Sequence, residues 1–133
     1  LENTKQANRQ EAQAAAEVTV APQKELISYD DFAKMDIRIG TILSAEKMPK
    51  ADKLLILKVD TGIDQRTIVS GIAQSFNPEE IIGKRVTVLA NLAPRKLRGV
   101  ESQGMILMVE NAEGKYRFIA PDGGEIANGA EVK

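Results

Sequence analysis

The chain has 133 residues, of which 43% are apolar, and this is enough for about one domain with a core of its own. It contains neither cysteine nor histidine, which excludes disulfide frameworks, thiol nucleophiles, zinc sites built from these residues and histidine general bases. No apolar run is long enough to span a bilayer, and the lack of cysteine fits the cytoplasm. We therefore expect a soluble cytoplasmic domain that does not contact a membrane.

The net charge of −1 conceals an uneven distribution of charge along the chain. Of the 18 cations and 19 anions, residues 1–31 hold three and six, which leaves 15 cations and 13 anions for the remaining residues. A net negative charge argues against nucleic-acid binding, but a local cluster of cations can still bind phosphates. The positions of the cations therefore decide this question.

Residues 1–25 differ in composition from the rest of the chain. They are rich in Ala, Gln and Glu, contain no glycine and have no wide apolar stripe. This composition is typical of a linker or a frayed helix, and a docked functional helix is the alternative. We divide the chain into a linker at 1–25 and a folded domain at 26–133. Because the first residue is Leu1, we expect that the linker joined the domain to a larger protein.

After the linker, the pattern predicts many short strands. Ser28 followed by Asp31 resembles a capping box and predicts a short helix that ends near Lys34. A second helical turn is expected from Asn77, and Gly83 ends it. Strands are predicted at residues 37–45, 54–59, 67–72, 85–90, 105–110 and 116–119.

This order of elements predicts an all-β protein. A helical turn between the third and fourth strands favours a five-stranded OB-fold barrel, and the last strand then forms a C-terminal β extension. A plain β-sandwich is the alternative. In the OB barrel, the loop between strands one and two and the loop between strands four and five flank the usual ligand face.

The predicted loops at residues 46–53 and 91–103 contain the clustered cations. These cations are Lys47, Lys50, Lys53, Arg95, Lys96 and Arg98. They can neutralise phosphates and release counterions, which supplies most of the sequence-independent affinity for nucleic acids. Lysines are also common in solvated loops without a function, but two basic loops on one face favour binding.

Aromatic residues do not occur in these two loops. The chain has Tyr29, Phe32, Phe76, Tyr116 and Phe118, all of them elsewhere in the sequence. Proteins that bind single strands usually stack the bases on aromatic rings. A binder without such rings is expected to recognise the shape of the backbone, which favours a folded RNA over single-stranded DNA.

Four blocks of sequence resemble one family in order and spacing. The blocks are residues 36–40 (DIRIG), 49–54 (PKADKL), 70–71 (SG) and 91–105 (NLAPRKLRGVESQGM). They resemble the tRNA-binding domain at the C-terminus of many bacterial methionyl-tRNA synthetases. The same domain occurs in stand-alone tRNA-binding proteins and in the endothelial monocyte-activating polypeptide. The resemblance runs from about residue 27 to the end of the chain and leaves out the linker.

The resemblance implies an OB barrel with a C-terminal β extension, homodimerisation, and binding to the outside of the tRNA elbow irrespective of the anticodon. It implies no catalysis and no cofactor on this chain, since ATP and methionine would bind elsewhere in a synthetase. The linker would lead to the catalytic body. In the family, a Ser-x-x-Met step is linked to tRNA binding. The predicted tRNA-binding residues are Lys50, Lys53, Asn91, Arg95, Lys96, Arg98, Ser102 and Met105.

Individual positions carry further expectations. Ser102 can donate a hydrogen bond to a phosphate or a 2′-hydroxyl, and Met105 can lie against an unstacked base or ribose. The alternative for Met105 is a buried strand residue. Met48 stands where the family often has histidine, so a hydrogen-bonding role there is in doubt. Arg38 is expected to be structural, and Gly40 indicates a bend or bulge.

Two other functions remain open at this point. A protein-binding module is the first, because an export chaperone shares this fold family, although it resembles the domain without the linker. A small enzyme that uses Asp52 and Lys53 or Ser102 is the second, but no activating base stands in a recognisable motif.

Overall fold

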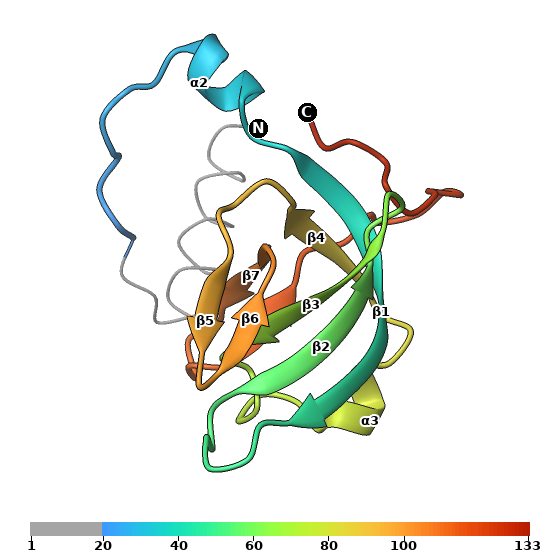
Figure 1. The fold of residues 1–133 in the computed structure, drawn as a ribbon. Coiled ribbons are helices and arrows are strands. Elements are labelled where there is room, and N and C mark those ends of the chain that lie inside the picture. Colours follow the sequence, from blue (N-terminus) through green and yellow to red (C-terminus); the bar gives the residue numbers. More distant parts are fainter. Residues whose placement is uncertain (1–19) are drawn as a thin grey trace.

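The computed structural model describes residues 20–133 of the chain (Figure 1). Residues 1–19, most of the predicted linker, lie outside the described part, and residues 20–25 are exposed and have no regular secondary structure. Within the described part, no helix is long and apolar enough to cross a membrane.

The described residues form short antiparallel strands and two short helices. The helices are α2 (Tyr29–Ala33) and α3 (Pro78–Ile81). The strands are β1 (Ile37–Lys47), β2 (Leu55–Asp60), β3 (Gln65–Ser70), β4 (Arg85–Leu89), β5 (Arg95–Leu97), β6 (Val100–Ser102), β7 (Met105–Glu110) and β8 (Tyr116–Phe118). The predicted capping box of α2 is present, because the Ser28 hydroxyl accepts from the Asp31 N–H and the Asp31 carboxylate accepts from the Ser28 N–H.

Strand β1 is the centre of a curved sheet. The sheet has six strands in the order β3-β2-β1-β4-β7-β8. The first half of β1 pairs with β4 and the second half pairs with β2, and the two ladders overlap only at Thr41. The β1–β2 register shifts between Ile42 and Ser44, which is a β-bulge that bends the strand. The sheet therefore curls on itself (Figure 1).

The two ends of the curled sheet meet through a few hydrogen bonds and not through a strand ladder. The Gln103 N–H donates to the Thr67 carbonyl at 2.8 Å, and the Val69 N–H donates to the Ser102 hydroxyl at 2.9 Å. These contacts join β3 to the end of β6 and to the turn before β7. The molecule is an open antiparallel barrel.

This architecture confirms the predicted all-β barrel with a helical turn between β3 and β4 and additional β structure at the C-terminus. Two details differ from the prediction. The continuous sheet contains six strands, because β8 pairs with β7 and extends it. The predicted loop at 91–103 contains a two-stranded hairpin, β5–β6, in which Arg95 faces Ser102 and Leu97 faces Val100.

The barrel encloses one main apolar core. Its buried members are Ile42, Leu55, Leu57, Val59, Ile68, Ile72, Ile81, Val86, Val88 and Ile106. Most come from alternate positions of the strands, and burying each such side chain contributes about 1.5–3 kcal/mol. The rings of Phe76 and Phe118 pack against this core and stack with their centroids 4.8 Å apart.

The C-terminal segment completes the part of β1 that β2 does not reach. The Gly129 N–H donates to the Ile39 carbonyl, the Ile39 N–H to the Ala130 carbonyl, and the Val132 N–H to the Ile37 carbonyl, at 2.7, 2.9 and 2.8 Å. The segment therefore covers an otherwise open strand edge.

Arg38 is structural, as predicted. It forms an ion pair with Asp36 at 2.7 Å and donates to the Gly129 carbonyl at 3.4 Å, which ties the C-terminal segment to β1. The hydrogen bond with Asp36 is the main reason that the pKa of Arg38 lies above its ordinary value. The prediction for Gly40 needs correction, since the bulge lies further along β1. A Cβ at Gly40 would lie 2.7 Å from the Asp60 carbonyl oxygen, so glycine is needed for close approach of β2.

We predict that Gly40→Ala lowers the free energy of unfolding by about 2 kcal/mol, because the new methyl group would collide with the backbone of β2. Urea denaturation measures this change. Gly123→Ala is the matched control, since a Cβ there would meet no atom within 4 Å and the change should be nearly neutral. Equal stability of both variants would show that β2 can move away from β1.

Candidate nucleic-acid interface

The hairpin β5–β6 carries half of the predicted binding residues. Its strands are joined by a two-residue turn in which Arg98 has φ 53° and Gly99 has φ 84°. Positive φ at both positions defines a type I′ turn, where Asn-Gly is the preferred pair and a long side chain at the first position is strained. Arg98 therefore holds an exposed cation at the tip of the hairpin at some cost in stability.

The other basic loop, between β1 and β2, has the same feature. Lys50 has φ 61°, and it is the only other non-glycine residue with positive φ in the described part of the chain. Lys50 and Lys53 are exposed in this loop, as are Arg95, Lys96 and Arg98 in the hairpin.

A second, smaller apolar core joins the two basic segments. Its buried residues are Met48, Ala51 and Val69, and Leu54, Ile56, Leu97 and Val100 pack against them. Ile56 and Val69 face each other on β2 and β3, on the side of the sheet away from the main core. The hairpin and the β1–β2 loop therefore pack against the same outer patch of the sheet. Met48, with 4% exposure, has a packing role in place of the hydrogen bond that histidine could offer.

Ser102 attaches the hairpin to β3. Its side chain is only 5% exposed, and its hydroxyl accepts from the Val69 N–H at 2.9 Å and donates to the Gly104 carbonyl at 3.5 Å. These bonds give Ser102 a positioning role within the domain, and its direct contact with RNA stays a prediction. Both partners of the hydroxyl are backbone groups, and neither can act as a base that activates it as a nucleophile.

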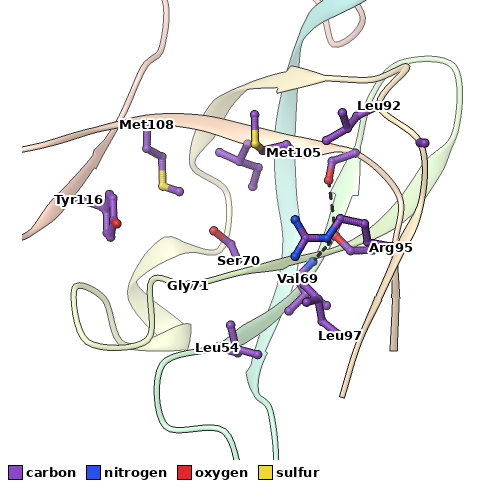
Figure 2. A pocket seen from close by; sticks show the side chains of 14 residues that line it. Leu54, Val69, Ser70, Gly71, Leu92, Arg95, Leu97, Met105, Met108 and Tyr116 are labelled. Atoms are coloured by element: carbon purple, nitrogen blue, oxygen red, sulfur yellow. Dashed lines mark hydrogen bonds between the residues drawn. The ribbon is translucent and has the colours of Figure 1, made fainter. Parts of the chain in front are cut away.

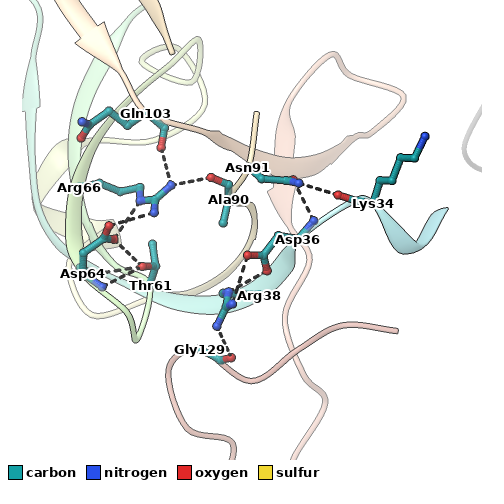
Figure 3. Close-up of polar contacts among 10 residues, drawn as sticks. All are labelled: Lys34, Asp36, Arg38, Thr61, Asp64, Arg66, Ala90, Asn91, Gln103 and Gly129. Atoms are coloured by element: carbon teal, nitrogen blue, oxygen red, sulfur yellow. Dashed lines mark hydrogen bonds and ion pairs between the residues drawn. The ribbon is translucent and has the colours of Figure 1, made fainter. Parts of the chain in front are cut away.

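Asn91 also positions the backbone. Its side-chain oxygen accepts from the Asp36 N–H at 2.8 Å, and its side-chain amide donates to the Lys34 carbonyl (Figure 3). These bonds fix the start of the basic segment against the end of α2 and the start of β1. Asn91 thus has a positioning role. Its side chain is exposed and uses only one donor and one acceptor site in these bonds, so its contact with RNA stays a prediction.

Arg66 clamps both ends of the 91–103 segment, and the sequence gave no indication of it. Its guanidinium donates to the Ala90 carbonyl at 2.6 Å and to the Gln103 carbonyl at 3.4 Å, on either side of the segment (Figure 3). Asp64 orients the guanidinium through two hydrogen bonds of 2.9 and 3.0 Å. Arg66, followed by the Thr61 hydroxyl, holds the pKa of the Asp64 carboxyl below its ordinary value.

A pocket of about 360 Å³ lies beside the hairpin (Figure 2). Met105 lines it with 42% of its surface exposed, so this residue is not the buried strand residue of the alternative interpretation. Leu92, Arg95 and Tyr116 line it as well. Tyr116 belongs to β8 and is distant in sequence from both basic loops, so no local pattern could have associated it with them.

The described residues contain no group of three or more histidine, cysteine, aspartate or glutamate side chains that could hold a metal ion. The arrangement therefore consists of exposed cations, an apolar pocket and the bonds that position them.

Comparison with known proteins identifies the family. A family model described as "Putative tRNA binding domain" matches residues 37–131. The chain belongs to this family of tRNA-binding domains. A methionine–tRNA ligase of Flavobacterium johnsoniae is 73% identical over 132 residues, which are 99% of this chain and 18% of the ligase. A methionine–tRNA ligase of Christiangramia forsetii is 62% identical over 132 residues, which are again 99% of this chain and 18% of the ligase. The chain thus spans about 18% of the length of these relatives.

Solved structures share the fold of this chain. A methionyl-tRNA-synthetase-related protein from Pyrococcus horikoshii superimposes with a TM-score of 0.75 at 42% identity, over 83% of this chain and 100% of that one. The chaperone CsaA from Bacillus anthracis has a TM-score of 0.73 at 26% identity, over 82% and 100%. The fold thus occurs in proteins described as synthetase-related and as a chaperone.

Arg98→Asn should raise the free energy of unfolding by about 0.5–1 kcal/mol, because asparagine adopts positive φ more readily in this turn. Thermal or urea unfolding measures the effect. Lys96→Asn, at a strand position of the same hairpin, is the control and should not stabilise the domain. A less stable Arg98→Asn protein would mean that the Arg98 side chain holds the hairpin in place.

Asp64→Asn should destabilise the domain by about 0.5–1 kcal/mol at neutral pH, since the carboxylate is half exposed and its ion pair is partly screened. Folding lowers the pKa of Asp64. The carboxylate therefore stabilises the fold fully at pH values above the pKa of the unfolded chain, about 3.9, and this stabilisation is lost as the pH falls through the pKa of the folded chain. The difference in free energy of unfolding between the unchanged protein and Asp64→Asn, measured by urea denaturation, should be constant from pH 5 to 7 and shrink below about pH 4. A pH-independent difference would contradict this role, and exposed Glu113→Gln serves as control.

Proposed function

We propose that this chain is a non-catalytic domain that binds tRNA by its shape and its phosphates. The observation that carries the proposal is the shared outer core, which brings the exposed cations of the β1–β2 loop and of the β5–β6 hairpin to one region. Lys50 and Lys53 belong to the first segment, and Arg95, Lys96 and Arg98 belong to the second. Membership in the tRNA-binding family and the ligase relatives support this choice of nucleic acid.

Local charge, and not net charge, drives this binding. Residues 84–98 contain five cations and no acid, although the whole chain has a net charge of −1. Cations that displace counterions from phosphates give an affinity that falls steeply with salt. The Arg66 clamp and the Ser102 hydroxyl hold these cations in a fixed arrangement, which suits a folded RNA of defined shape.

The role in the larger protein follows from the size of the match. The chain corresponds to a small share of methionine–tRNA ligases, so we infer that it is attached through residues 1–25 to the catalytic body of such a cytoplasmic enzyme. ATP and methionine would bind to that body and not here. The domain would tether tRNA and raise its local concentration at the catalytic site. A homodimer, which we include in the proposal, would present two such surfaces.

A protein-binding function is the second candidate. The likeness to chaperone CsaA and the apolar pocket beside the hairpin favour it. The ligase relatives, which match 99% of the chain at much higher identity, favour tRNA.

Titration of total tRNA at two salt concentrations, with single-stranded DNA alongside, tests the proposal. The chain should bind tRNA more tightly than the DNA, and the binding should weaken steeply with salt. Equal or absent binding of both nucleic acids would overturn the proposal. Binding of an unfolded peptide in the absence of tRNA binding would establish the second candidate.

Lys96→Ala/Arg98→Ala should weaken tRNA binding and reduce the magnitude of the slope of log affinity against log salt by about 2, because about one counterion is released per phosphate contact. Fluorescence anisotropy at several salt concentrations measures the slope. Lys24→Ala/Lys133→Ala removes the same charge at exposed positions outside both basic segments and outside residues 84–98, and is the matched control. An unchanged slope in the first variant would remove the hairpin from the contact.

A further inference from the structure

The pocket beside the hairpin, here named the Met105 pocket, combines apolar walls with a few polar groups. Leu54, Leu92, Met105 and Tyr116 are among its lining residues. They come from the β1–β2 loop, the β4–β5 connection, β7 and β8, so the pocket exists only in the folded domain. Its volume of about 360 Å³ lies within the range of small-ligand sites.

The polar side chains of the lining are Ser70, Arg95, Tyr116 and Ser102, and the hydroxyl of Ser102 is already bound to backbone groups. Figure 2 shows the Ser70 hydroxyl directed into the pocket, without a hydrogen bond to any other lining residue. Arg95 extends from β5 along the wall of the pocket, and its guanidinium lies on the side of Val69 and Leu97. A ligand in the pocket therefore meets the hydroxyls of Ser70 and Tyr116 and the cation of Arg95 within an apolar surround.

We propose that the Met105 pocket binds a single unpaired nucleobase of the RNA, an inference that rests on the proposed function. The thioether of Met105 and the ring of Tyr116 offer polarisable surfaces to the face of a base. The Ser70 hydroxyl donates to or accepts from the edge of the base. Arg95 binds the phosphate of the same nucleotide, because the hairpin leads from the pocket to the other cations.

Charge complementarity selects a nucleotide over an apolar peptide side chain. None of the residues that line the pocket is an aspartate or glutamate, and Arg95, which lines it, belongs to the same hairpin as Lys96 and Arg98. The phosphate of a nucleotide can pair with Arg95, whereas an apolar peptide side chain gains nothing from this cation. The domain thus reads one base in addition to shape.

Methionine methyl groups provide a direct measurement. The chain has four methionines, and Met105 and Met108 line the pocket, while Met35 and Met48 do not. In a sample labelled with ¹³C at the methionine methyls, tRNA should shift the Met105 and Met108 signals upfield through the ring current of the bound base. Met35, which follows α2 in the chain and does not line the pocket, is exposed and is the internal control that should not shift. Adenosine monophosphate should produce the same pattern at high concentration, and ribose 5-phosphate should not.

Affinity measurements complete the test. Met105→Ala should weaken tRNA binding about tenfold, as expected for the loss of one base contact, and Leu92→Ala should weaken it in the same direction. Both side chains are about 40% exposed, at 42% and 39%, so the variants should remain folded. Val109→Ala is the matched control, because Val109 lies on the same strand, is 53% exposed and does not line the pocket.

The outcomes separate the two proposals. Salt-sensitive tRNA binding without shifts at Met105 and Met108 would overturn the base pocket and leave the proposed function standing. Equal shifts with ribose 5-phosphate and adenosine monophosphate would also overturn base recognition. No tRNA binding at all would overturn both. Shifts caused by an apolar unfolded peptide, but not by tRNA, would assign the pocket to a peptide.

Discussion

The attachment of the 91–103 segment to strand β3 determines where the candidate binding residues lie. Three sets of hydrogen bonds make this attachment. Arg66 binds the carbonyls that flank the segment, the Ser102 hydroxyl accepts from Val69, and the Gln103 N–H binds Thr67. The same contacts close the barrel between β3 and the end of β6 with the turn before β7. The contacts that close the barrel therefore also position the cations. Loosening β3 would displace the hairpin and the Met105 pocket together.

This construction explains how a slightly acidic domain can offer a basic surface. The cations stand on two short segments that have little regular structure to support them, and a small outer core of Met48, Ala51 and Val69 supplies the support. Ser102 illustrates the consequence for interpreting the family motif. Its hydroxyl is buried and bound to backbone groups, so in this structure Ser102 holds the hairpin in place. Met105, three residues later, is exposed and available to a ligand.

Backbone strain is concentrated in the same region. Lys50 and Arg98 are the non-glycine residues with positive φ in the described part of the chain, and each lies in one of the two basic segments. Strained conformations persist where the surroundings enforce them, and they accumulate at sites that bind ligands. A chain selected for stability alone would have glycine or asparagine at these positions. The positions of Lys50 and Arg98 agree with the proposed role of the two basic segments in binding phosphates.

The sequence by itself determined the elements whose signals are local. The capping box of Ser28 and Asp31 predicted α2, and alternation or short apolar runs predicted the strands of the barrel to within a few residues. The ion pair of Asp36 and Arg38 was also accessible, because the two residues are near neighbours in the chain. The family resemblance added the candidate binding residues, whose contacts with RNA remain predictions.

Only the tertiary structure decided the arrangement of the candidate site. The hairpin inside 91–103 has strands of three residues each, too short to show a periodicity, so the segment resembled a loop. The burial of Ser102, the clamp of Arg66 and the place of Tyr116 in the pocket depend on partners that are distant in the chain. A local sequence pattern depends only on residues that are close to one another in the chain. Which side chains meet across a closed barrel is decided by the packing of the whole chain.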